Sequence, residues 1–89
     1  MSAQTSIQLS DKDNVAVVLS EVCAGETVQP ASVTASEAIP RGHKLALTPI
    51  GEGEAVVKYG QIIGFASAPI GIGEHVHVHN VSMGEFERD

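Results

Sequence analysis

A seven-residue pattern with a central glycine recurs four times in this chain of 89 residues. Each copy begins with an apolar residue, followed by two residues, a glycine, two further residues and a second apolar residue. The copies are Val22–Val28, Ile39–Leu45, Ile50–Val56 and Ile70–Val76. A glycine at a fixed place supplies a positive φ angle without steric cost, and the flanking apolar side chains then return to a core. The pattern therefore predicts four tight turns, which we call corners, in a small and tightly folded β unit.

The residue after the central glycine differs in one of the four corners. It is glutamate in three copies (Glu26, Glu54 and Glu74) and histidine, His43, in the second copy. Because the glutamates recur with the corner, we interpret them as structural, with carboxylates that are solvated or satisfy the turn, rather than catalytic.

The segments between the corners resemble strands. Val, Ile and Ala dominate the apolar residues, and nine Gly and four Pro favour short strands joined by many turns. Strands are expected at 7–9, 54–59, 61–66 and 75–81, with a bulge or turn at Gly60.

One segment has a different periodicity. Val15, Val18, Leu19 and Val22 have the spacing of a helical stripe and follow polar N-cap candidates, which predicts a short helix; a buried strand is the alternative. The expected fold is a single mainly β domain spanning 1–89, with short strands, one short helix, a core at about 7–81 and a polar tail at 82–89.

Composition narrows the class of partner. The net charge is −6 with five Lys and Arg, which argues against nucleic acid or an anionic membrane. The longest apolar run, Val15–Leu19, is far too short for a membrane helix, and the polar start lacks a secretory pattern, so a cytoplasmic location is expected.

A single cysteine, Cys23, excludes an internal disulfide and is expected to be a small core residue. A chain this short buries only ~60% of its unfolded surface, which favours a homo-oligomer, a larger partner or a bound ion.

Three of the four histidines alternate near the end of the chain. His75, His77 and His79 are followed by Asn80. On a strand these three rings share one face, and rings two residues apart begin roughly 6.6 Å apart, a span that two imidazoles can close onto one metal ion. The alternative is an exposed polar face above packed valines.

A second group of candidates follows the second corner. Lys44 is one of few cations in an acidic chain and is a candidate to bind a carboxylate, while His43 is a candidate acid or base. The alternative is a surface lysine beside a turn histidine.

Several stretches together indicate a family. The residues at 13–17, 42–47, 57–64 and 73–80 resemble the small N-terminal domain of the altronate and galactarate dehydratase family, and the resemblance covers about 7–81. That domain is of the SAF type and has a β-clip fold. In some members, including the sulfolactate sulfo-lyase, it is a separate small subunit, and this chain resembles that split form.

The resemblance implies a site shared with a large catalytic subunit. The family reaction removes water from a sugar acid to give a 2-keto-3-deoxy acid and needs a divalent metal, Fe²⁺ or Mn²⁺. The candidate residues on this chain are His43, Lys44 and His77 for catalysis, Lys44 and Asn80 for substrate binding, and His75, His77 and His79 for the metal. The resemblance does not divide these roles among the histidines, and the large subunit is an alternative location for the metal.

Two other functions remain open at this stage. One is release of sulfite from sulfolactate by the same architecture. The other is a non-enzymatic ligand-binding or carrier module, since Lys58 resembles a lipoyl or biotinyl lysine on a hairpin, although its neighbours Val56, Val57 and Tyr59 are expected to be packed.

Overall fold

The structure is a computed structural model, and it describes residues 5–83, which form short strands without any helix. The strands are β1 (Ser6–Ile7), β2 (Val15–Val18), β3 (Thr27–Val28), β4 (Val33–Thr34), β5 (Lys44–Ala46), β6 (Ala55–Lys58), β7 (Gln61–Ala66), β8 (His75–Val76) and β9 (Val81–Ser82). The predicted mainly β class is confirmed. Within the described residues no helix exists that is long and apolar enough to cross a membrane.

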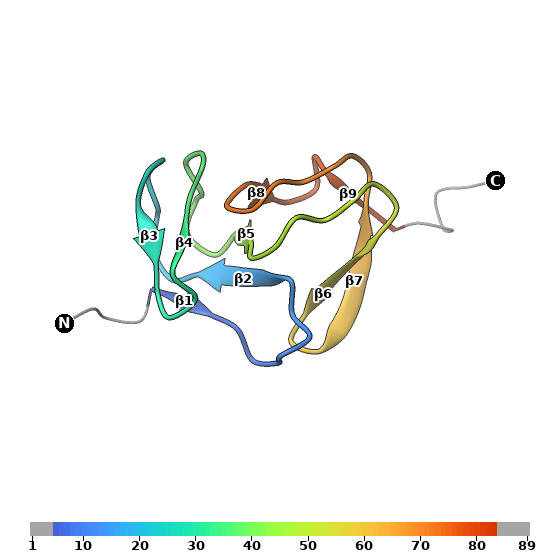
Figure 1. Ribbon diagram of the computed structural model, residues 1–89, viewed down its shortest axis with the longest axis horizontal. Coiled ribbons are helices and arrows are strands. Elements are labelled where there is room, and N and C mark those ends of the chain that lie inside the picture. Colours follow the sequence, from blue (N-terminus) through green and yellow to red (C-terminus); the bar gives the residue numbers. More distant parts are fainter. Residues whose placement is uncertain (1–4, 84–89) are drawn as a thin grey trace.

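The strands form three antiparallel sheets. One has the order β1-β2-β5-β8, a second pairs β3 with β4, and the third has the order β6-β7-β9. In Figure 1, β2 crosses the middle of the molecule, with the β3–β4 hairpin at one end and the β6–β7 hairpin at the other.

The predicted helix is wrong, and the segment forms the central strand β2. Val15 and Ala16 are both fully buried and Val18 is nearly so, because each face of this strand meets a different core cluster. A strand covered on both faces reads as a continuous apolar run, and such a run matches a helical stripe by coincidence. Leu19, which a helix would bury, is 42% exposed.

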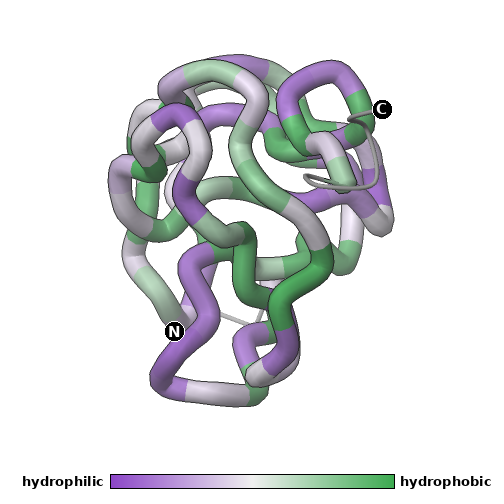
Figure 2. The backbone as a smooth tube through the Cα atoms, turned by 90° about the vertical axis from the view of Figure 1, so that its right-hand side faces the viewer, coloured by the Kyte–Doolittle hydropathy of each residue, from purple (hydrophilic) through white to green (hydrophobic). Residues whose placement is uncertain are grey.

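The core consists of two clusters of small aliphatic side chains. The first includes Val18, Val22, Val28, Ile39 and Leu45, and extends under the β3–β4 hairpin. The second consists of Val15, Ala46, Ile50, Val56, Ala66, Ile70 and Val76. Figure 2 shows hydrophilic and hydrophobic stretches alternating at short intervals, as expected where each strand enters the core for only a few residues between turns.

The β6–β7 hairpin has the turn that Gly60 predicted. Tyr59 and Gly60 have φ angles of 54° and 78°, the combination that a two-residue type I′ turn requires. Asp13 fastens this turn to the segment before β2, since the Gly60 N–H donates to Asp13 Oδ1 at 2.7 Å. Lys58 is half-buried one residue before the turn, with its Nζ 5.3 Å from the centre of the Tyr59 ring, and Tyr59 itself is exposed rather than packed.

Candidate functional site

The four corners fold as the repeated pattern predicts. Their central glycines, Gly25, Gly42, Gly53 and Gly73, have φ angles of 92°, 82°, 86° and 84°. In each corner the N–H of the residue after the glycine donates to the carbonyl three residues earlier, at 2.9–3.1 Å. The apolar residues that flank the corners are all buried. This is β-turn geometry with a left-handed third residue, the position that favours glycine.

Glutamates close the first and third corners, in keeping with the structural role that their recurrence indicated. The Cys23 N–H donates to Glu26 Oε1, and the Gly51 N–H donates to Glu54 Oε1, both at 2.8 Å. In the second corner the equivalent of Cys23 and Gly51 is Pro40, which has no N–H to donate. A carboxylate after Gly42 would find no partner there, so the position is open to another side chain, His43.

Pairing of β5 with β8 brings the second and fourth corners together. Lys44 lies opposite Val76, and Leu45 lies opposite His75. His43, immediately before β5, therefore reaches His75 across 32 residues of sequence, with His43 Nδ1 2.8 Å from His75 Nε2. Only one of these two nitrogens carries the proton in that hydrogen bond, so the other offers a lone pair.

His77 completes a group of three histidines, and a turn rather than a strand brings its side chain there. The predicted strand at 75–81 is wrong: β8 ends at Val76, and residues 77–80 form a turn. The turn folds back because Asn80 binds the backbone with both ends of its side-chain amide. Asn80 Oδ1 accepts from the His77 N–H at 2.9 Å, and Asn80 Nδ2 donates to the His75 carbonyl at 2.8 Å. Asn is favoured in turns for this ability.

The turn stacks the His77 ring on His43, with ring centres 3.9 Å apart and planes 20° from parallel. One potential ligand nitrogen from each of His43, His75 and His77 lies within 4.8 Å of the other two, and we call these residues the histidine trio. All three are half-buried. His79 is exposed, and its ring centre lies 5.0 Å from that of His75, outside the trio.

The His77 ring has an unusual environment. Its Nδ1 atom is buried and has no hydrogen-bond partner among the described residues. Leaving a buried polar atom unsatisfied costs about 1–3 kcal/mol, so such an atom calls for an explanation, such as an ion or a further ligand.

Burial favours the neutral form of two members of the trio. Desolvation is the largest of the effects that lower the pKa of His75, and the other histidines add to it, against a smaller opposing effect of Glu37. Desolvation also lowers the pKa of His77 most, followed by the charges of His43 and Lys44. Neutral imidazoles are the form that binds metals and accepts protons.

A groove with a volume of about 280 Å³ opens beside the trio. It is lined by Lys44, Ile63, His77, Val78, Val81, Ser82 and Met83, and we call it the Lys44 groove. Lys44 is half-buried, and desolvation together with the nearby Lys58 lowers its pKa. The groove thus combines one cation and one imidazole with apolar walls, an arrangement suited to a small anion.

Sequence reasoning missed one polar neighbour of the trio. Glu37 Oε2 accepts from the His75 N–H at 3.1 Å, although 38 residues separate the two. No local pattern marks Glu37, because it belongs to a segment between corners that reads as an exposed loop. That segment nevertheless contains β4 and the buried side chains of Val33 and Ala35. Cys23, expected in the core, is exposed.

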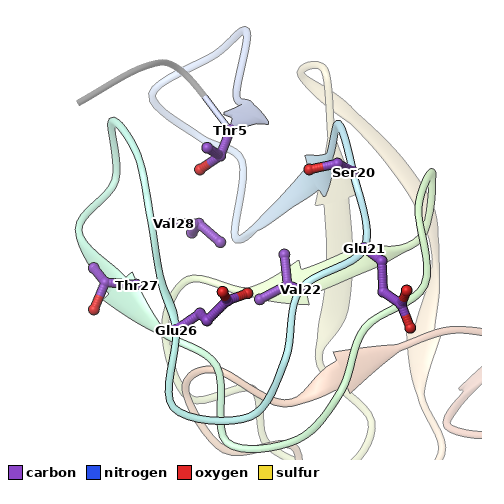
Figure 3. A pocket seen from close by; sticks show the side chains of 7 residues that line it. All are labelled: Thr5, Ser20, Glu21, Val22, Glu26, Thr27 and Val28. Atoms are coloured by element: carbon purple, nitrogen blue, oxygen red, sulfur yellow. The ribbon is translucent and has the colours of Figure 1, made fainter.

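A second hollow, of about 340 Å³, lies far along the sequence from the histidines and is shown in Figure 3. It is lined by Thr5, Ser20, Glu21, Val22, Glu26, Thr27 and Val28. Its polar groups serve the fold: Glu26 closes the first corner, and Thr5 Oγ1 accepts from the Gln29 N–H at 2.8 Å. The histidine trio and the Lys44 groove therefore form the stronger candidate site.

Comparison with known proteins adds the following findings. A model of the altronate/galactarate dehydratase SAF domain matches residues 4–84. The altronate dehydratase of Bacillus subtilis is 45% identical over 76 residues, which cover 83% of this chain but 15% of the relative. The galactarate dehydratase (L-threo-forming) of Escherichia coli is 35% identical over 81 residues, again 15% of its length. The (2R)-sulfolactate sulfo-lyase subunit alpha of Chromohalobacter salexigens is 56% identical over 45 residues, which cover 51% of this chain and 48% of the relative.

Proposed function

Because the chain belongs to the altronate/galactarate dehydratase SAF domain family, as its motifs indicated, we propose that it is the small subunit of a two-subunit sugar-acid dehydratase. The chain spans about 15% of the length of the dehydratase relatives. In this proposal it acts with a large catalytic subunit and is inactive alone. The observation that carries the proposal is the histidine trio beside Lys44 at an open groove, a partial active site on a small domain.

The proposed reaction is the loss of water from a sugar acid such as altronate or galactarate. A base removes the proton on C2, and an acid protonates the C3 hydroxyl, which leaves as water. The resulting enol then tautomerises to the 2-keto-3-deoxy acid. Lys44 pairs with the substrate carboxylate as a point charge in the Lys44 groove. His43 and His77 take part in the reaction as ligands of the metal ion described below, and the acid and the base belong to the large subunit.

Asn80, suggested by the sequence as a substrate ligand, has a different role in this proposal. Both ends of its side-chain amide are engaged with the backbone of the 77–80 turn. It therefore acts on the reaction by holding His75 and His77 in place.

A divalent metal ion, Fe²⁺ or Mn²⁺ by the family resemblance, is part of the proposal. The residues present fit such an ion, since three imidazoles converge and His77 Nδ1 is buried without a partner among the described residues. When bound, the ion supplies a positive charge that holds the enolised carboxylate.

The test is reconstitution. The chain is co-expressed with a candidate large subunit, a polypeptide from the same organism that matches the remaining part of the altronate dehydratase relatives, and dehydration of altronate and galactarate is assayed with added Fe²⁺ or Mn²⁺. The proposal predicts a stable complex and activity that neither polypeptide has alone. Full activity of the large polypeptide without this chain, together with no complex between them, would reject it.

A sulfo-lyase is the second candidate function. It is favoured by the 56% identity to a sulfolactate sulfo-lyase subunit alpha, a relative that is named as a subunit. The same groove would then hold the carboxylate of sulfolactate while sulfite leaves in place of water. Release of sulfite from sulfolactate by the complex, without dehydration of sugar acids, would select this function over the first.

A further inference from the structure

We infer that this chain by itself binds one divalent transition-metal ion through His43, His75 and His77, and that His79 is not a ligand. The inference rests on the proposed function for its purpose and deepens it by naming the ligands and the class of metal. Binding by the isolated chain is nevertheless measurable without any partner or substrate.

The first argument is distance. Two imidazole nitrogens bound to one tetrahedral zinc ion, with bonds of 2.0–2.1 Å, lie roughly 3.3 Å apart. Nitrogens of the trio lie within 4.8 Å of one another, and one pair, His43 Nδ1 and His75 Nε2, is separated by 2.8 Å. Small side-chain rotations bring all three to bonding distance, and the ion replaces the hydrogen bond between His43 and His75.

The second argument is the unsatisfied atom. His77 Nδ1 is buried and unpartnered among the described residues, while its ring packs against that of His43. Such a buried polar atom is destabilising unless a partner binds it. A metal ion bound by His77 Nδ1 would be such a partner. An ion bound at the trio would explain why the His77 ring is held in this position.

The third argument is pre-organisation. The His43 backbone is held by the second corner, where its N–H donates to the Pro40 carbonyl at 3.0 Å and its own carbonyl accepts from the Val18 N–H at 2.9 Å. Glu37 holds the N–H of His75, and Asn80 holds that of His77. Ligands fixed by such backbone contacts lose little freedom when they bind an ion.

The fourth argument concerns the kind of metal. No carboxylate joins the trio in the group of potential ligands that residues 5–83 bring together. Imidazole ligands suit Zn²⁺, Co²⁺, Ni²⁺ and Fe²⁺, whereas Mg²⁺ and Ca²⁺ prefer oxygen. A tripod of three histidines also leaves at least one metal position open, as catalytic sites do. His79 projects from the exposed part of the turn and stays outside this tripod.

The test uses the full chain without a polyhistidine tag, stripped of metal with EDTA. Calorimetric titration with Zn²⁺, and absorption titration with Co²⁺, should both give one ion per chain, while Mg²⁺ and Ca²⁺ should not bind measurably. His43→Ala, His75→Ala and His77→Ala should each weaken binding by more than about 100-fold, since the loss of a ligand exceeds the usual effect of losing an outer partner. His79→Ala is the matched control and should bind as the unchanged chain does.

A second measurement uses the unchanged chain, so it does not require any variant to fold. In imidazole NMR spectra of the unchanged chain, Zn²⁺ should shift the ring signals of His43, His75 and His77 and leave those of His79 in place. No binding, or binding lost equally in the His79 variant with shifts of its ring, would overturn the inference. Metal binding at the trio without dehydratase or sulfo-lyase activity in the complex would instead reject only the proposed function.

Discussion

His43 owes its availability to the residue three positions before it. In the first and third corners a glutamate after the glycine accepts from a backbone N–H at 2.8 Å. Pro40 removes that N–H from the second corner, so a histidine there costs the corner nothing and is available for the trio. The sequence shows that His replaces Glu in the second corner. The reason for the replacement depends on which N–H group the glutamates bind, and only the structure shows that contact.

A double-mutant cycle tests this account of the second corner. The carboxylate introduced by His43→Glu should gain a partner only when residue 40 offers an N–H, so Pro40→Ala and His43→Glu together should be more stable than the sum of the single changes predicts. The expected coupling is about 0.5–1.5 kcal/mol, the net value of one hydrogen bond. Urea denaturation of the four proteins measures it, and additive effects would show that the corner does not depend on this contact.

Among the elements, the corners and the β6–β7 hairpin were predictable from the sequence, because positive φ angles leave a glycine signature. The central strand β2 and the 77–80 turn were not. β2 is buried on both faces by residues distant in sequence, and the alternation of His and Val from His75 is interrupted by Asn80, whose contacts with His75 and His77 create the turn. Neither the burial of β2 on both faces nor the contacts of Asn80 produces a local periodic pattern in the sequence.

Two glycine corners with the same backbone conformation should differ in their tolerance to a methyl group. A Cβ at Gly73 would overlap the Thr34 carbonyl oxygen, whereas a Cβ at Gly25 would meet nothing within 4 Å. Gly25→Ala should cost about 1–2 kcal/mol, the strain of a left-handed residue, and Gly73→Ala several kcal/mol or the fold itself. Equal losses in urea denaturation would show that β4 does not pack against the fourth corner.

The Asn80 amide should be the element that fixes the trio. Asn80→Ala removes the acceptor for His77 and the donor to His75, with a stability loss of about 1–3 kcal/mol. Zn²⁺ affinity should fall by about 10–100-fold, the usual effect of losing a residue that orients metal ligands. Asn14→Ala is a matched control: its amide also binds backbone, at Ala55 and Val57, and its loss should lower stability with less effect on Zn²⁺ binding.

On the scale of the whole molecule, the site lies where two similar halves meet. Val22 of the first corner pairs with Ile39 of the second, and Ile50 of the third with Ile70 of the fourth. The strands that follow the second and fourth corners, β5 and β8, then pair with each other. The sequence revealed the four corners but not this pairing, so it grouped His79 with its neighbours rather than His43 with His75.

We expect acid to lower the free energy of unfolding by protonating Asp13. Its burial alone would raise the pKa, but hydrogen bonds from the backbone N–H groups of Gly60, Tyr59, Leu9 and Ser10 outweigh burial and lower the pKa below its ordinary value. A carboxyl with a lower pKa in the folded state stabilises the fold above its unfolded pKa and loses that contribution as the pH falls through its folded pKa. Asp13→Asn should therefore destabilise the chain at pH 7, and the difference from the unchanged chain should shrink below about pH 4. Denaturant titrations at both pH values measure this, and a difference independent of pH would contradict it.

The most direct test of the account is kcat/KM of the reconstituted complex carrying His43→Ala, with His79→Ala as the matched control. If the trio that β5 and β8 assemble is part of the active site, His43→Ala should lower kcat/KM by at least about 100-fold while the two polypeptides stay associated. His79→Ala should change it only a few-fold. Undiminished activity in the His43 variant, or an equal loss in both variants, would contradict the account.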